Sequence, residues 1–526
     1  MKLKSKIFFL LSIAAGLLTA CQKQFLDRPP LGQISADNFY QTTSDLRLAT
    51  AALYGGSPWG EWNYNCYLPV GEVLSGNMSV GYWGDAVQLN TFSVTGANGI
   101  MVSNWSGMYK VIAHCNVTIN AIQKKAPASI PVKDRNAAIA EAKFIRGFAY
   151  YNLALLWGAV PIIEDNEKLI SSPLVNRVVV EDVYKFVTND LTFAAQNLPA
   201  TDAAGRVTTW SAQGMLAKTY LTLAGLGQNG TRDQAYLDSA KKYAGNVCKN
   251  SGKSLLPNYA DLFKTQFNDN QESLFALQWV AADAGWLGGN MLQIYSSGGV
   301  EISANGQAGW FGIKPTIDMY NQYESADSLR RKATFMLKDD YYPELNAAGG
   351  GFKFKGDAGL KKHIIGTNVD NNAPTMGLTS SNEHNSLLRL ADVYLIYAEA
   401  ILGNNASTTD ADALLYFNAV RERAGLDKLS MLNADILFKE RRIELAGESH
   451  FWADLVRLSY YNSGKAISYL NNQQRVNFEY NDGAVTKVSE PWGAITPASI
   501  GTFTFPIPSA EVTVNPKLAE APVHYF

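Results

Sequence analysis

The densest group of ionisable side chains in the 526-residue sequence lies between Glu440 and Asp454. Glu440 and Glu444 are four residues apart, so a helix would place both carboxylates on one face. Such a pair could serve glycoside hydrolysis, in which one carboxyl donates a proton and the other acts as base or nucleophile. Cationic side chains in or just beyond this stretch could pair with these carboxylates: Arg441, Arg442, His450 and Arg457. The alternative is a partly buried network of ion pairs and helix caps that joins helices to loops.

Other signatures of catalysis or metal binding are missing from the sequence. It contains no HExxH zinc motif, no GxSxG nucleophile elbow and no Walker A loop. The formal net charge of -2 gives no general attraction to nucleic acid. The histidines have no ligand-like spacing, although residues distant in sequence can still meet around a metal: His114, His363, His384, His450 and His524. We therefore expect a binding protein without a cofactor, a metal or a nucleic-acid partner, and not an enzyme.

Two stretches, 55–99 and 281–314, are rich in glycine, asparagine and aromatic residues and show little helical periodicity. A pyranose has one flat face of C–H groups and a rim of hydroxyls, so binding it from water needs a rigid aromatic plane with polar groups at its edge. The candidate ligand-binding residues in these stretches are Tyr82, Trp83, Trp286, Tyr295 and Trp310, with Asn77 and Asp283 at the edge.

Trp83 and Trp286 are the foremost candidates among these residues. Both are flanked by glycines, such as Gly84 and Gly285, which remove neighbouring side chains and leave room for an exposed ring. The alternative for each aromatic residue is that it anchors its loop in the core.

The amino terminus has the form of a bacterial lipoprotein signal. Lys2, Lys4 and Lys6 precede an apolar run, 7–18, that is too short to span a bilayer comfortably. The run ends at Leu18-Thr19-Ala20-Cys21, which resembles a lipobox, so we expect residues 1–20 to be removed and Cys21 to be acylated. The alternative is an ordinary secretory signal followed by a chance cysteine. A tether is expected over 21–34, and the three later cysteines permit at most one disulfide: Cys66, Cys115 and Cys248.

The rest of the chain reads as a series of helices with few strands. Apolar residues recur every three or four positions over 134–157, and further helices are expected over 181–197, 209–224, 232–249, 411–424 and 434–445, with a helical block beginning at Ser386. Small residues on these helices would allow close approach, which favours stacked TPR-like hairpins. A short strand is expected over 273–280, and an extended tail over 502–526. We expect two regions, 35–260 and 261–526, packed as one unit.

Several motifs in this order are typical of one family. They are Glu141–Tyr151 (EAKFIRGFAYY), Leu388–Ala400 (LRLADVYLIYAEA), Glu440–Glu448 (ERRIELAGE) followed by His450–Arg457 (HFWADLVR), Phe505–Pro508 (FPIP), and the mature start with Cys21 and Phe25-Leu26-Asp27. Together they span nearly the whole chain, and the sequence resembles the SusD/RagB family of outer-membrane nutrient-binding lipoproteins. The last six residues depart from the family's usual ending.

The resemblance implies four TPR-like helix pairs that support a loop-rich ligand face. It implies a lipid-anchored protein of the outer membrane, facing the cell exterior, whose partner is a SusC-like TonB-dependent transporter. Relatives mostly bind glycans, so capture and delivery of an oligosaccharide or polysaccharide is the preferred function. The alternatives are a peptide-capturing RagB-like protein, a surface glycosidase, and a lid without ligand affinity. Because Glu440–Asp454 lies inside a scaffold motif of the family, its structural interpretation is preferred, as it is for Arg389 and Asp392.

Overall fold

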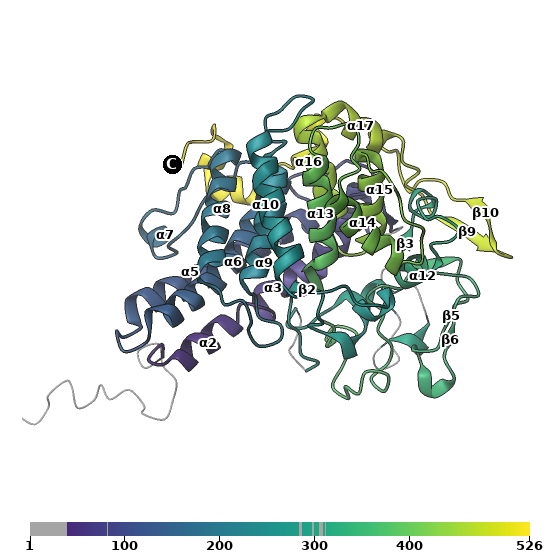
Figure 1. The fold of residues 1–526 in the computed structure, drawn as a ribbon, viewed down its shortest axis with the longest axis horizontal. Helices are drawn as coiled ribbons and strands as arrows, with labels where there is room; N and C mark the ends of the chain where they lie inside the picture. Colours follow the sequence, from purple (N-terminus) through teal and green to yellow (C-terminus); the bar gives the residue numbers. More distant parts are fainter. Residues whose placement is uncertain (1–38, 81–82, 283–286, 297–298, 304–308, 311) are drawn as a thin grey trace, which may run out of the picture.

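The structure is a computed structural model that describes residues 39–80, 83–282, 287–296, 299–303, 309–310 and 312–526. Helices form most of the architecture, and the strands are short and paired in twos (Figure 1). The expectation of a mainly α fold with few short strands is confirmed.

A row of helices forms the body of the molecule, and each helix packs against the next (Figure 1). In order these are α5 (Gly99–Lys125), α6 (Val132–Trp157), α8 (Val180–Asn197), α9 (Thr209–Leu223), α10 (Gln234–Asn250), α13 (Leu390–Leu402) and α14 (Ala411–Arg423). Close approach depends on small residues, as the sequence predicts. A Cβ added to Gly245 of α10 would lie 2.8 Å from the Tyr397 ring of α13, so only glycine permits this spacing.

Further helices extend or flank this row. α2 (Thr43–Ala51) packs on α6, α3 (Ser57–Asn65) packs on α5, and α15 (Ala434–Glu444) packs on α13. The remaining helices are α4 (Gly84–Asn90), α7 (Lys168–Ser171), α11 (Ile317–Tyr320), α12 (Ser328–Thr334), α16 (Phe451–Tyr461), α17 (Ser463–Asn471) and α18 (Ser509–Val514).

The strands form five antiparallel pairs within the described residues. They are β1 (Met78–Ser79) with β3 (Lys314–Pro315), β2 (Ser273–Ala276) with β8 (Ser386–Arg389), β4 (Phe335–Leu337) with β7 (Ala358–Leu360), β5 (Tyr341–Tyr342) with β6 (Phe352–Lys353), and β9 (Phe478–Asn481) with β10 (Ala484–Val488). The β2–β8 pair joins two segments that are more than a hundred residues apart in the sequence, since Ser273 lies opposite Arg389.

Local sequence signals explain where the predicted helices begin and end. α9 begins with a capping box between Thr208 and Ser211, and α6 ends where Gly158 adopts a φ of 65°. The predicted short strand is present as β2. The helical block predicted from Ser386 begins four residues later, because Ser386–Arg389 pairs with β2 as a strand before α13 starts.

Two expectations about irregular segments are wrong. The stretch 55–99 is largely helical, with α3, a π-helical turn at Pro69–Val73 and α4. Burial against α5 and the rest of the core stabilises these helices despite their glycines and asparagines. The tail is not simply extended either, since it contains α18 and two 3-10 turns, Ile500–Phe503 and Pro516–Ala519.

One continuous hydrophobic core contains residues from both halves of the chain, from Leu46 to Phe505. The boundary between the regions 35–260 and 261–526 stays a prediction. Cys66, Cys115 and Cys248 are all free thiols. Within the described ranges, none of the helices combines the length and the apolar character that a membrane span requires.

Candidate functional site

Three of the predicted aromatic residues come together from separate segments of the chain. The Trp83 ring stacks on the Tyr295 ring, with centroids 6.4 Å apart and planes inclined by 25°. The backbone N–H of Trp310 donates to the Ile294 carbonyl at 2.7 Å, which places Trp310 beside the 3-10 turn Leu292–Tyr295. Trp310 is 45% exposed, whereas Tyr295 is fully buried. We call Trp83, Tyr295 and Trp310 the aromatic platform.

The platform is fixed by contacts with α3 and α4. The Tyr295 hydroxyl donates to the Tyr64 carbonyl of α3 at 2.5 Å, which sets the height and tilt of its ring. A Cβ on Gly60 would lie 1.4 Å from the Leu287 carbonyl oxygen, so glycine is required where this segment crosses α3. Trp83 is the residue just before α4, and its backbone carbonyl accepts from the Val87 N–H at 2.9 Å. The Asn98 side chain holds α4 by donating to the Asp85 carbonyl at 2.9 Å.

The positions of the other candidates differ from what the sequence led us to expect. Trp83 is only partly exposed, because its ring packs against the Tyr295 ring instead of standing free. Asn77 is fully buried: its amide donates to Glu72 Oε2 at 2.9 Å and accepts from Arg442 Nε at 2.7 Å. Asn77 therefore has no surface with which to contact a ligand, and the same holds for the fully buried Tyr295, which can act only as a support for Trp83. Tyr82, Trp286 and Asp283 lie outside the described residues.

The segment Glu440–Asp454 forms a buried network of ion pairs, as its structural interpretation predicts. Arg389 lies at the centre, 2.8 Å from Glu272, 2.6 Å from Glu444 and 2.7 Å from Glu448. Further pairs surround it, including Arg330 with Glu440 at 2.6 Å, Arg423 with Glu272 at 2.7 Å, and Arg441 with Asp392 at 2.8 Å and Asp454 at 2.9 Å.

Cationic neighbours in this network lower the pKa of three of its carboxyls, those of Asp392, Glu444 and Glu448. Burial alone would raise the pKa of the Glu448 carboxyl, but Arg389 and Lys362 lower it below its usual value. Burial likewise opposes ionisation of Asp392, yet Lys218 and Arg441 lower the pKa of that carboxyl. A general acid for glycoside cleavage needs a raised pKa, and the shifts here run the other way. The Arg389 cluster thus fits a scaffold that fixes β8 and α13 to the loops.

In the part of the chain that the structure describes, no three acidic, histidine or cysteine side chains lie close enough together to hold a metal ion.

Comparisons with known proteins match both halves of the chain. Residues 349–524 match a family model described as "SusD family", and residues 69–221 match one described as "Starch-binding associating with outer membrane". A SusD-like protein of Bacteroides ovatus is 38% identical over 544 residues, covering 99% of this chain and 98% of that protein. A crystal structure solved with xylogluco-oligosaccharide is 37% identical, with a TM-score of 0.85 over 91% of this chain and 99% of that one.

A SusD superfamily protein from Parabacteroides distasonis shares the fold at 20% identity, with a TM-score of 0.70 over 92% of this chain and 99% of that one. The family expected from the sequence motifs is thus confirmed, and the chain belongs to the SusD family.

Proposed function

We propose that this protein captures a glycan at the aromatic platform and delivers it to a SusC-like TonB-dependent transporter of the outer membrane. The observation that carries the proposal is the 37% identical structure, aligned over 99% of its length, that was solved with xylogluco-oligosaccharide. The partly exposed Trp83 and the 45% exposed Trp310 support it, because an accessible aromatic plane suits the C–H face of a pyranose. A β-glucan backbone with xylose branches is therefore the first ligand to test.

Calorimetric titration with xylogluco-oligosaccharide, followed by analysis of the recovered sugar, tests this proposal. We expect saturable binding and recovery of the intact oligosaccharide. New reducing ends would mean hydrolysis and would revive the glycosidase alternative. Failure to bind any member of a panel of xyloglucan, laminarin and starch oligosaccharides would overturn glycan capture and favour a peptide ligand.

The proposed membrane anchor is an acyl group on Cys21, which precedes the described residues. In membrane fractionation of the native host, wild-type protein should sediment with the outer membrane, and Cys21→Ser should become soluble. An equal membrane fraction for the two proteins would contradict acylation.

Purification of the wild type in mild detergent should also recover a large outer-membrane protein, and its absence would count against the transporter partnership.

A further inference from the structure

A groove of about 220 Å³ lies between the loop 200–206, which joins α8 to α9, and the segment 269–276, which contains β2. Trp210, in the first turn of α9, lines this groove together with polar side chains that include Asp202, Lys253 and Asn270. The residues of the aromatic platform are not among the described residues that line it. The groove is therefore a separate hollow with an aromatic ring in its wall.

Ion pairs hold the loop side of the groove in place. Arg47 Nη1 donates to Asp202 Oδ2 at 2.8 Å, and Arg206 Nη1 donates to Glu141 Oε2 at 2.7 Å. Because each of these charges already has an opposite partner, the loop contributes a fixed wall and no unpaired ion.

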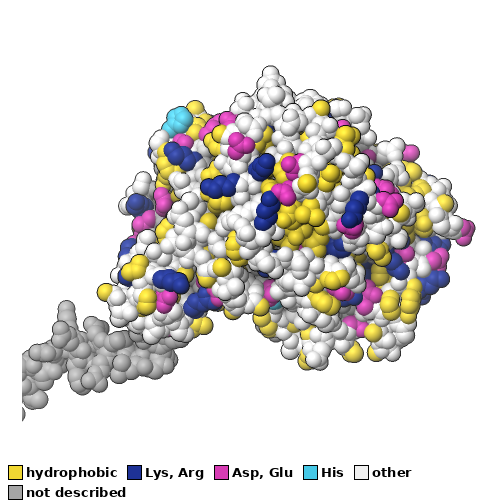
Figure 2. All heavy atoms as spheres, viewed as in Figure 1, with side chains coloured by type: hydrophobic (Ala, Val, Ile, Leu, Met, Phe, Trp, Pro, Cys, Tyr) yellow, Lys and Arg dark blue, Asp and Glu magenta, His cyan; other side chains and the backbone are white. Residues whose placement is uncertain are grey.

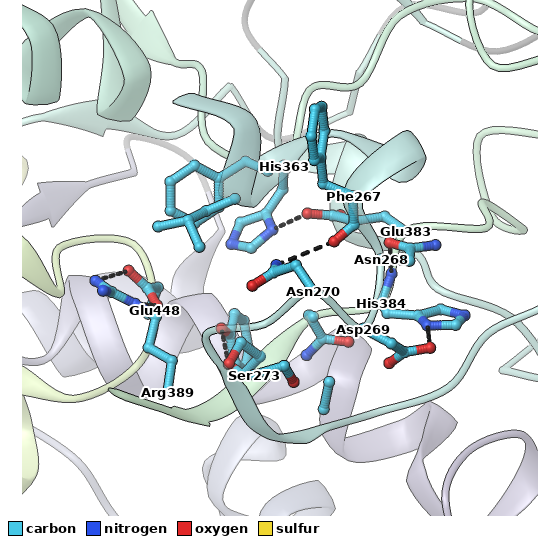
Figure 3. A pocket seen from close by; sticks show the side chains of 16 residues that line it. Phe267, Asn268, Asp269, Asn270, Ser273, His363, Glu383, His384, Arg389 and Glu448 are labelled. Carbon is cyan, nitrogen blue, oxygen red and sulfur yellow. Dashed lines mark hydrogen bonds and ion pairs between the residues drawn. The ribbon is translucent and has the colours of Figure 1, made fainter. Parts of the chain in front are cut away.

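The opposite wall is also held in place. Asp269 accepts from Gln278 Nε2 at 2.8 Å and lies 3.0 Å from His384 Nδ1, while Asn270 Nδ2 donates to the Phe267 carbonyl at 3.0 Å. Figure 3 shows the last two contacts in a small polar cavity that the same segment also lines. Both walls of the groove are thus formed without a ligand, which lowers the entropic cost of binding one.

Two hydrogen-bond donors in the groove retain capacity for a ligand. Lys253 Nζ donates to the Ser273 carbonyl at 2.7 Å, and it pairs with no carboxylate of the described residues. An ammonium carries three N–H groups, so two remain available. Burial lowers the pKa of Lys253, and hydrogen bonds to ligand oxygens would favour its charged form. Trp210 is partly exposed, and its indole N–H has no acceptor among the described residues.

An aromatic plane edged by ammonium, amide and indole donors suits a ligand with many hydroxyls and a flat C–H face. We propose that this groove is a second sugar-binding site, in which Trp210 supplies the plane and Lys253 and Asn270 bind the hydroxyls of one glycan unit. The class of ligand rests on the proposed function. A polysaccharide held at the platform and at the groove together would dissociate more slowly than one held at a single site.

Fluorine NMR of protein labelled with 5-fluorotryptophan tests the groove directly. The signals are assigned with single Trp→Phe variants, and xylogluco-oligosaccharide is the titrant. We expect the Trp210 signal to shift saturably in wild type and also in the double variant Trp83→Ala/Trp310→Ala, which lacks the accessible rings of the platform. Trp492 is the matched control, because it is 59% exposed on the segment that follows β10, and its signal should stay fixed.

Lys253→Met tests the groove without altering an aromatic ring. In the double-variant background it should weaken the remaining affinity about tenfold, the usual effect of losing a hydrogen bond from a charged group. Lys241→Met, at an exposed position of α10, is the control and should keep that affinity. Melting curves on the same samples check that each variant is folded. Equal affinity of the two lysine variants would contradict the proposed site.

The same titrations separate this proposal from capture at the platform. A Trp210 signal that stays fixed well beyond saturation of the platform would overturn the groove as a sugar site and leave the proposed function intact. A saturable shift at Trp210 without any change at Trp83 and Trp310 would instead overturn capture at the platform and leave the groove.

Discussion

Replacement of Arg389 by methionine should destabilise the protein by about 3–5 kcal/mol, the usual cost of removing one partner from a buried ion pair. Arg389 is 1% exposed and contacts three carboxylates, those of Glu272, Glu444 and Glu448. Methionine fills much of the same volume but leaves buried negative charge with less compensation. Arg330, Arg423 and Lys362 remain nearby, so the loss should stay within this range. Urea or thermal unfolding monitored by circular dichroism measures it.

A matched control is Lys124→Met, which breaks the pair with Glu167 on the surface. Both side chains of that pair are more than half exposed, at 57% and 75%, so the loss of stability should be much smaller than that of Arg389→Met. A comparable loss of stability in the two variants would contradict the interpretation that the buried Arg389 network stabilises the fold more than a surface ion pair does.

The pH dependence of the same variant provides an independent check. Arg457 and Arg232 outweigh burial to lower the pKa of Glu399 to about 2, and Glu444 and Glu448 are lowered by their own cationic partners. A carboxyl whose pKa is lowered by folding stabilises the protein at pH values above its ordinary pKa. This contribution is lost as the pH falls through the pKa of the folded state. In Arg389→Met the orphaned carboxyls can take up protons in acid. The difference in stability from wild type should therefore shrink between neutral pH and about pH 4.

Charged side chains are distributed differently on the surface and in the interior of the molecule. Figure 2 shows acidic and basic side chains interspersed on the visible face, without a large area of one sign. The charged clusters that carry the fold, around Arg389 and Arg441, are buried.

The parts of the fold that sequence predicted well are those with a local cause. The apolar stripe of α6, the cap of α9 and the β-rich run of β2 all lie within a few residues of the features they determine. The sequence analysis did not predict α5, although its buried residues Trp105, Met108 and Ile112 recur at helical spacing. Its glycines, asparagines and β-branched residues have low helix propensity, and packing between α3 and α6 overrides that preference.

The arrangement of the candidate site depends on contacts between residues that are far apart in the sequence, and no local sequence pattern predicts such contacts. The sequence located the ion network by Glu440 and Glu444, but Glu272 and Arg330 reach it from more than a hundred residues away in the chain. Stacking of Trp83 on Tyr295 joins residues more than two hundred positions apart, so the glycine beside Trp83 could not reveal that the ring is partly covered. Asn77 lies in a polar stretch whose burial is decided by Arg442.

The two described tryptophans of the platform should respond differently to truncation, and this contrast tests the glycan site. Trp310→Ala removes a ring that is 45% exposed, so the melting temperature should change little. Trp83→Ala also removes a stacking partner of Tyr295, so it should cost about 0.5–1.5 kcal/mol of stability in addition to any loss of binding. If Trp83 is a central plane for a sugar, its loss should weaken binding by about 2 kcal/mol, or about thirtyfold in the dissociation constant.

Titration of xylogluco-oligosaccharide into both alanine variants, with melting curves on the same samples, separates these effects. Trp83→Phe should recover part of the affinity, because a smaller aromatic plane remains. Trp157→Ala is the control for a purely structural tryptophan: the ring is 2% exposed in α6, so this variant should lose about 3–5 kcal/mol of stability. Unchanged affinity in both Trp83→Ala and Trp310→Ala would remove the described platform from the binding site. A stability loss for Trp83→Ala as large as that for Trp157→Ala would instead mean that its ring serves the core, since the cost of truncation would then match that of a fully packed side chain.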